Sequence, residues 1–121
     1  MVKALFDTNI LIDYLNGHEP ARAELQLYEA RAISVITWME VLIGATPETE
    51  AATRAFLGSF TLLALDERIA ERAVAIRRRL RIKLPDALIK ATAEVDGRLL
   101  VSRNTRDFPA SEPGVRVPYQ R

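Results

Sequence analysis

Short apolar runs alternate with segments of helical periodicity along the whole chain, and this alternation constrains the fold more than any other feature. Short runs rich in Val, Ile, Leu and Phe favour strands, whereas apolar residues that recur at i, i+3 and i+4 favour helices. Strands that alternate with helices are typical of an α/β domain with a parallel sheet. We therefore expect a single α/β domain over residues 1–121, built as a sandwich around a mostly parallel sheet of about four or five strands.

The boundaries of these elements follow from glycine, proline and capping residues. Gly17 and Pro20 interrupt the chain after the first helix, and Gly97 ends the last one. Helices are expected at residues 8–15, 20–30, 38–45, 47–58, 67–80 and 84–96. Strands are expected at residues 2–6, 32–35, 60–65 and 98–102, with a short last strand around Val115 and Val117.

The composition excludes several kinds of site. No apolar run reaches the roughly 18 residues of a membrane span, and no segment resembles a secretory signal. The absence of cysteine excludes disulfides, thiolate nucleophiles and zinc–thiolate sites, and it fits a cytoplasmic protein. The net charge of +1 means that any nucleic-acid binding depends on a local patch. His18 is the only histidine, so carboxylates must carry most acid–base or metal chemistry.

Four carboxylates stand at positions typical of catalytic or metal-binding residues. Asp7 ends the first strand, Glu40 lies in the apolar run Trp38–Ile43, Asp86 begins an otherwise apolar helix, and Asp107 follows the fourth strand. In a parallel sheet, strand ends and helix starts meet at one edge, where ligands bind. Carboxylates that meet there repel each other and resist ionisation. A divalent cation such as Mg²⁺ or Mn²⁺ would relieve the repulsion, activate water and stabilise charge on a phosphodiester.

Three of these carboxylates also have a purely structural interpretation. Asp7 is a good helix N-cap, and Asp86 suits the positive end of a helix dipole. Glu40 completes a capping box if Thr37 caps its helix, but it needs another partner if Ser34 is the cap. For each residue taken alone, the structural interpretation and the metal-binding interpretation are equally well supported. The metal site is favoured only because the four positions occur together.

Four segments resemble the motifs of the PIN-domain family, in the family's order and over nearly the full length. These segments are Asp7-Thr8-Asn9, Ile36–Val41, Leu84–Ile89 and Val101–Phe108. Within the family, this short form is most similar to the VapC toxins of VapBC toxin–antitoxin pairs. The resemblance implies a PIN-like α/β/α fold and a Mg²⁺- or Mn²⁺-dependent endoribonuclease that cleaves RNA phosphodiester bonds with metal-activated water.

The resemblance also assigns residues and partners. It implies that Asp7, Glu40 and Asp86 form the acidic metal site, with Asp107 as the fourth acidic position. Many family members have an acid where Asn104 stands here, and this departure affects how a second metal would be held. The residues implied to orient carboxylates or contact phosphate are Thr8, Asn9, Ser102 and Asn104. The implied partners are RNA, a VapB antitoxin that lays its C-terminal segment across the site, and a second copy of the chain in a homodimer.

Several charged and aromatic residues allow more than one interpretation. Arg103 and Arg106 flank the expected site and are expected to contact phosphate, because arginine donates paired hydrogen bonds to it. The basic stretch Arg77–Lys83 fits either a solvated helix end or a contact with RNA phosphate. Trp38 is expected in the core or an interface, and Asp13 is expected to be a solvated helix residue.

Two other functions fit parts of the pattern. A receiver-like signalling domain would use Asp66, which follows the third strand, as its phosphoacceptor. That alternative conflicts with the single acid after the first strand and with Arg103 where a lysine would follow the fourth. Asp66 also fits the N-cap of the next helix. A second alternative is a binding module that kept the fold without activity, although the intact Asp7, Glu40 and Asp86 argue against it.

Overall fold

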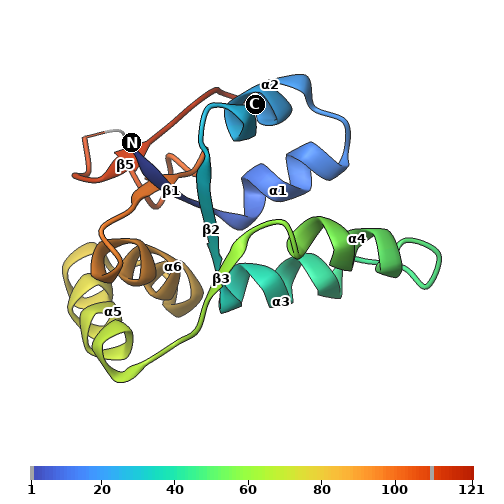
Figure 1. The fold of residues 1–121 in the computed structure, drawn as a ribbon. Coiled ribbons are helices and arrows are strands. Elements are labelled where there is room, and N and C mark those ends of the chain that lie inside the picture. Colours follow the sequence, from blue (N-terminus) through green and yellow to red (C-terminus); the bar gives the residue numbers. More distant parts are fainter. Residues whose placement is uncertain (1, 110) are drawn as a thin grey trace.

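The computed structural model describes residues 2–109 and 111–121, in which helices alternate with strands as expected (Figure 1). The strands are β1 (Lys3–Phe6), β2 (Ala30–Ser34), β3 (Thr61–Leu63), β4 (Leu99–Val101) and β5 (Val115–Arg116). The helices are α1 (Thr8–Leu15), α2 (Glu19–Gln26), α3 (Val35–Ile43), α4 (Glu50–Leu57), α5 (Glu67–Leu80) and α6 (Leu84–Val95). None of the helices in these two ranges is long and apolar enough to cross a membrane.

The five strands form one sheet in the order β3-β2-β1-β4-β5, and every neighbouring pair is parallel. Leu5 of β1 pairs with Ala32 of β2 on one side and with Leu100 of β4 on the other. The α/β prediction is therefore confirmed. Because the chain leaves β1 toward one half of the sheet and returns to β4 in the other, the C-terminal ends of β1 and β4 form a topological switch point, the usual ligand site of such sheets.

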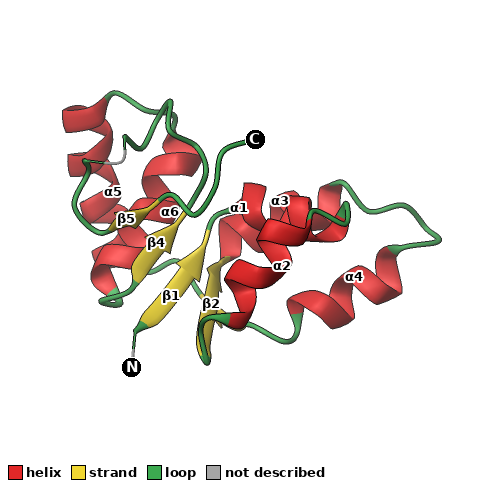
Figure 2. Cartoon of the chain, turned by 90° about the horizontal axis from the view of Figure 1, so that it is seen from above, coloured by secondary structure: helices red, strands yellow, loops and turns green. Residues whose placement is uncertain are grey.

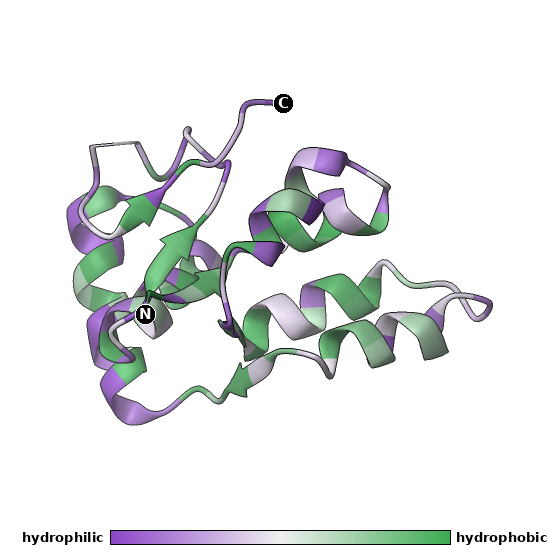
Figure 3. Ribbon diagram, turned by 45° about the horizontal axis from the view of Figure 1, so that its top comes forward, coloured by the Kyte–Doolittle hydropathy of each residue, from purple (hydrophilic) through white to green (hydrophobic). Residues whose placement is uncertain are grey.

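Helices cover both faces of the sheet and bury one apolar cluster on each (Figure 2). Phe6 and Val101 point toward the cluster under α1 to α4, whereas Leu5 and Leu100 point toward the cluster under α5 and α6. This alternation is the two-residue period of strands buried on both faces. Figure 3 shows the result, because β1 and β4 in the sheet are mostly green while the helices carry both green and purple stretches.

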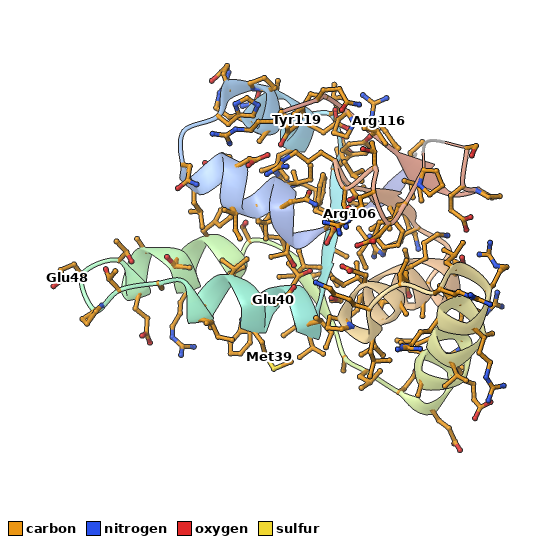
Figure 4. All side chains as sticks on the ribbon, turned by 180° about the vertical axis from the view of Figure 1, so that it is seen from behind. Met39, Glu40, Glu48, Arg106, Arg116 and Tyr119 are labelled. Carbon is orange, nitrogen blue, oxygen red and sulfur yellow. The ribbon has the colours of Figure 1, made fainter. Side chains whose placement is uncertain are left out.

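Helix α3 begins three residues earlier than expected because Ser34 is its N-cap. The Ser34 side chain accepts a hydrogen bond from the Thr37 backbone N–H at 3.1 Å. The capping-box interpretation of Glu40 with Thr37 as the cap is therefore wrong. Helix α4 begins at Glu50 rather than residue 47, so Glu48 lies outside it, at the tip of the α3–α4 pair (Figure 4).

The junction between α5 and α6 brings a basic helix end next to the sheet edge. Helix α5 ends where Arg81 takes a left-handed conformation with φ of 57°, and α6 starts after Lys83 with Pro85 in its first turn. A link of only residues 81–83 holds the C-terminal end of α5 beside the N-terminal end of α6. Asp86 in the first turn of α6 therefore follows this basic stretch closely along the chain.

Candidate active site

Asp7 joins the ends of β1 and β4. It follows β1 directly and is only 3% exposed. Its Oδ1 accepts the Thr8 backbone N–H at 2.8 Å, and its Oδ2 accepts the hydroxyl of Ser102, after β4, at 2.7 Å. Asn9 donates to the same Oδ2 at 3.3 Å. Asp7 is thus both the N-cap of α1 and a carboxylate held at the switch point.

Glu40 reaches the same region from α3. Its Oε1 accepts the Thr8 hydroxyl at 2.7 Å, and Thr8 Oγ1 also lies 3.0 Å from Thr37 Oγ1. Thr37 is buried beneath this contact, whereas the Glu40 residue remains exposed. With Ser34 as the cap, Glu40 lies one turn deeper in the helix and its partner is Thr8, next to Asp7. Figure 4 shows Glu40 near the middle of the molecule.

Asp86 and Asp107 meet at the other side of this edge. A hydrogen bond joins their carboxyl groups. Asn104 supports the pair, because its Nδ2 donates to Asp107 Oδ2 at 3.0 Å and its Oδ1 accepts the Asp107 backbone N–H at 3.2 Å. The Asn104 backbone N–H in turn donates to Ser102 Oγ at 3.0 Å. The loop after β4 therefore connects Asp7 with Asp107 through Ser102 and Asn104.

The electrostatics show that the four carboxylates influence one another. Burial, the charge of Asp7, and the hydrogen bond and charge of Asp107 raise the pKa of Asp86 to about 7, and Glu40 adds to the effect. Burial also raises the pKa of Asp7, with Glu40 adding to it, although hydrogen bonds from Ser102, Thr8 and Asn9 oppose the shift. Groups from β1, α3, α6 and the loop after β4 thus share one electrostatic environment.

This donor set fits a hard divalent cation. All four candidates are carboxylates, which Mg²⁺ and Mn²⁺ accept. The raised pKa values of Asp7 and Asp86 mark uncompensated negative charge at the site. Among residues 2–109 and 111–121, no three His, Asp or Glu side chains already stand in a geometry that would hold an ion. Binding would therefore require side-chain rotation, which the exposed Glu40 and the half-buried Asp86 and Asp107 allow.

Asp13 differs from its sequence-based prediction. Its side chain is 2% exposed, so the expectation of a solvated residue is wrong. Burial alone would raise the pKa of Asp13, but hydrogen bonds from Arg103 and Tyr119 and the charges of Arg103 and Arg121 outweigh burial and lower it. Asp13 follows Asn9 by one helical turn, so the two side chains lie on the same face of α1, but this spacing alone does not distinguish Asp13 from a solvated helix carboxylate. The sequence pattern did not identify its partners, which lie about 90 or more positions away.

The arginines near the site differ in what they contact. The Arg103 guanidinium is bound to Asp13, with Nε–Oδ2 at 2.5 Å and Nη2–Oδ1 at 3.1 Å. Arg106 is exposed on the loop after β4, near the middle of the molecule in Figure 4. At the α5–α6 junction Arg79 pairs with Glu112 at 2.8 Å. Its basic neighbours are exposed and form no ion pair with the described residues; they are Arg77, Arg78, Arg81 and Lys83.

Asp66 and Trp38 have structural environments. Asp66 Oδ1 accepts the Ile69 backbone N–H at 2.9 Å, so Asp66 is the N-cap of α5. Trp38 packs against the apolar cluster under α1 to α4, and the Arg54 guanidinium lies 5.6 Å from its ring centroid. Both observations agree with the structural interpretations, and neither supports a phosphoacceptor role for Asp66.

Comparisons with known proteins agree with this geometry. The family model described as PIN domain matches residues 4–110. Ribonuclease VapC10 of Mycobacterium tuberculosis (strain ATCC 25618 / H37Rv) is 35% identical over 130 residues, covering 97% of this chain and 96% of that protein. A chain of a toxin–antitoxin complex from Klebsiella pneumoniae is 46% identical with a TM-score of 0.93, over 98% of this chain and 100% of that one. DNA-bound VapBC from Salmonella typhimurium gives 29% identity and a TM-score of 0.79, with 96% of each chain covered.

Proposed function

Because this chain belongs to the PIN-domain family, we propose that it is a Mg²⁺- or Mn²⁺-dependent endoribonuclease and the toxin of a VapBC-type toxin–antitoxin pair. The relative named Ribonuclease VapC10 and the similarity to chains of toxin–antitoxin complexes support the activity and the biological class. The single observation that carries the proposal is the convergence of Asp7, Glu40, Asp86 and Asp107 on one sheet edge. Residues 1–121 act in this proposal as one PIN-like domain.

The chain's own residues divide the work at the site. Asp7, Glu40 and Asp86 would hold the metal, with Asp107 assisting. When bound, the metal would neutralise these carboxylates, acidify an attacking water and offset charge on the phosphodiester. The residues that keep the carboxylates oriented are Thr8, Asn9, Ser102 and Asn104. No protein nucleophile is required, because the carboxylates can accept the proton of the attacking water.

RNA would approach along the basic rim of the site, which we define as Arg77, Arg78, Arg81, Lys83 and Arg106. The first four lie in the last turn of α5 and in the link that precedes α6 and Asp86, and Arg106 precedes Asp107. Exposed arginines without carboxylate partners suit phosphate, which they bind with paired hydrogen bonds. Arg103 was expected to contact phosphate as well, but its engagement with Asp13 makes Arg106 the better candidate.

The antitoxin would cover an apolar groove beside Glu40. This groove of about 510 Å³ lies between α1 and the α3–α4 pair, and its lining includes Ile12, Leu15, Val41 and Ala52. Ile12 is 40% exposed and Leu15 is 42% exposed, and exposed apolar patches commonly mark protein–protein contacts. Leu15→Glu should weaken binding to the co-expressed protein encoded beside this chain and leave RNA cleavage intact. Unchanged co-purification would place the antitoxin elsewhere.

Assembly and location complete the proposal. The chain would form a homodimer, which light scattering on the purified protein can test. It would act in the cytoplasm, where the RNA substrate and the antitoxin are made. The absence of cysteine is consistent with that compartment.

A cleavage assay tests the proposal directly. The purified protein should cut RNA with Mg²⁺ or Mn²⁺ and lose the activity in EDTA, with recovery when excess metal is restored. Metal-independent cleavage would contradict the metal site. Absence of cleavage with either metal, on a panel of tRNA, rRNA and mRNA, would favour the alternative of an inactive binding module.

A further inference from the structure

Asp13 is a buried carboxylate outside the four-residue site, and it gathers three donor side chains. Arg103 binds it through both Nε and Nη2, Tyr119 Oη donates to Oδ2 at 2.7 Å, and Arg121 Nη1 donates to Oδ1 at 2.8 Å. Two arginines thus face one carboxylate, and all of these bonds join α1 to segments at least 90 residues away. So many charge-assisted bonds on a side chain that is 2% exposed indicate a fixed anchor point.

The segment anchored at Asp13 is the loop that orients the candidate carboxylates. Arg103 stands between Ser102, which donates to Asp7, and Asn104, which holds Asp107. The Arg103 backbone N–H also donates to Asn9 Oδ1 at 3.3 Å. Asn9 and Asp13 lie one turn apart on α1, so that helix holds Arg103 at two points, by its main chain and by its side chain.

We propose that Asp13 is a positioning residue, which fixes the loop of residues 102–107 through Arg103 so that Asp7 and Asp107 can share a divalent cation. The inference rests on the proposed function for the identity of the ion. Asp13 touches neither substrate nor metal in this arrangement. Its effect passes through the Arg103 main chain to Ser102 and Asn104.

Loss of Asp13 would disturb the site in two ways. The loop would lose its side-chain anchor, so the hydrogen bonds of Ser102 to Asp7 and of Asn104 to Asp107 would be less well oriented. The Arg103 guanidinium would also be released beside a negatively charged edge, where it could neutralise the carboxylates in place of a metal ion. Both effects weaken cation binding, and outer-shell partners of metal sites typically change affinity or activity on the order of 10- to 100-fold.

Glu24 provides a matched control for Asp13. Its buried carboxylate binds Arg116 through Nε at 2.6 Å and Nη2 at 3.0 Å, and it accepts the Tyr28 hydroxyl at 2.9 Å. The side chain of Glu24 is 5% exposed, close to the value for Asp13. Arg116 contacts the site only through its main chain, because its carbonyl accepts the Ser102 backbone N–H beside the β4–β5 pairing. Its guanidinium takes no part in that contact.

The experiment compares Asp13→Asn with Glu24→Gln in the full chain. Mn²⁺ affinity is measured by calorimetric titration without RNA, amide hydrogen exchange is followed in residues 103–107, and kcat and KM are measured for RNA cleavage. Asp13→Asn should reduce Mn²⁺ affinity and kcat on the order of 10- to 100-fold and speed exchange in the loop. Glu24→Gln should lower Tm by a similar amount yet keep Mn²⁺ affinity and kcat near the parent values.

If Asp13→Asn does not fold, Arg103→Gln provides a second test. In that variant the buried Asp13 carboxylate keeps its hydrogen bonds from Tyr119 and Arg121, so the fold should be retained. Arg103→Gln should reproduce the loss of Mn²⁺ affinity and kcat, whereas a role in phosphate contact alone would raise KM. The positioning role would be overturned if Asp13→Asn and Arg103→Gln both kept the parental Mn²⁺ affinity. It would also be overturned if Glu24→Gln lost as much Mn²⁺ affinity and kcat as they do. If the parent protein binds no Mn²⁺ and cuts no RNA, the proposed function fails, and unchanged loop exchange in Asp13→Asn would then reject the anchor separately.

Discussion

Asp7 combines a structural and a chemical role that the sequence alone presents as alternatives. One oxygen of its carboxylate accepts the Thr8 N–H as a helix cap, and the other receives Ser102 and Asn9. An N-cap does not require burial or bonds from a second strand, yet Asp7 is 3% exposed and has both. The cap holds the carboxylate at the switch point, so the two interpretations are compatible.

Asp7→Asn should abolish RNA cleavage while leaving the fold intact. Asparagine keeps the size of the side chain and remains a good N-cap, so stability should change little, but it removes the negative charge that a cation requires. The loss of cleavage should exceed the ~100-fold that an outer-shell change can produce. Cleavage rates at equal Mg²⁺ and the far-ultraviolet circular dichroism spectrum measure the two effects. Parental cleavage by a folded variant would refute the assignment of Asp7.

Residues differed in how far their roles were predictable from sequence. Asp7, Glu40, Asp86 and Asp107 stood out because a charged residue at the end of a strand or in an apolar run is unusual. The resemblance to the PIN motifs then placed them together. Asp13 did not stand out, because a carboxylate in the middle of an amphipathic helix is normally solvated. Its burial depends on long-range partners that local periodicity does not encode.

At the scale of secondary structure, helix caps determine where the side chains of the site point. Ser34 starts α3 at Val35, and this start puts Glu40 within reach of Thr8. The sequence offered Ser34 and Thr37 equally, since both residues are good caps and both precede the same apolar run. Tertiary contact decides between them, because Thr37 is fully buried against Thr8. Helix boundaries were therefore less predictable than the order of the elements.

Ser34→Ala and Asp66→Ala should separate stability from activity. Each change removes one side-chain cap and should lower the free energy of unfolding by about 1 kcal/mol. Only Ser34 caps the helix that carries Glu40, so Ser34→Ala should also reduce cleavage, whereas Asp66→Ala should not. Urea unfolding and cleavage rates at saturating Mg²⁺ measure both effects. A large loss of cleavage in Asp66→Ala would revive the receiver alternative. Phosphorylation of Asp66 in the parent protein by a small phosphodonor would do the same.

At the scale of the whole molecule, the negative charge of the four candidate carboxylates lies at one edge of the sheet, between the two apolar clusters. Parallel strands converge there by topology, and the helices on both faces limit access of water to Asp7. The order of strands and helices was predictable from the sequence because hydrophobic periodicity encodes it. The electrostatic coupling among four distant carboxylates required the assembled sheet. Such a site costs stability when it is empty and ionised, and a bound cation offsets that cost.

The metal-free protein should therefore lose stability as the pH rises from about 5.5 to about 8. The pKa of Asp86 in the folded protein, about 7, is above its ordinary value of 3.8, so the folded state binds the proton more tightly than the unfolded state. The resulting stabilisation is complete below the unfolded pKa and is lost as the pH rises through the folded pKa. Asp13 and Asp66 have lowered pKa values and remain ionised across this window, so they do not counteract the trend.

Asp86→Asn removes the titrating group and should flatten this pH dependence. The variant should be more stable than the parent in EDTA at about pH 8, because it lacks the ionised carboxylate that burial and its neighbours disfavour. Added Mg²⁺ should raise the Tm of the parent at that pH and leave the Tm of the variant almost unchanged, since Asp86 is a proposed ligand. Thermal unfolding of both proteins at the two pH values, with EDTA and with Mg²⁺, measures all of these differences. A parent protein that is more stable at the higher pH in EDTA would contradict the raised pKa, and equal Mg²⁺ stabilisation of both proteins would remove Asp86 from the metal site.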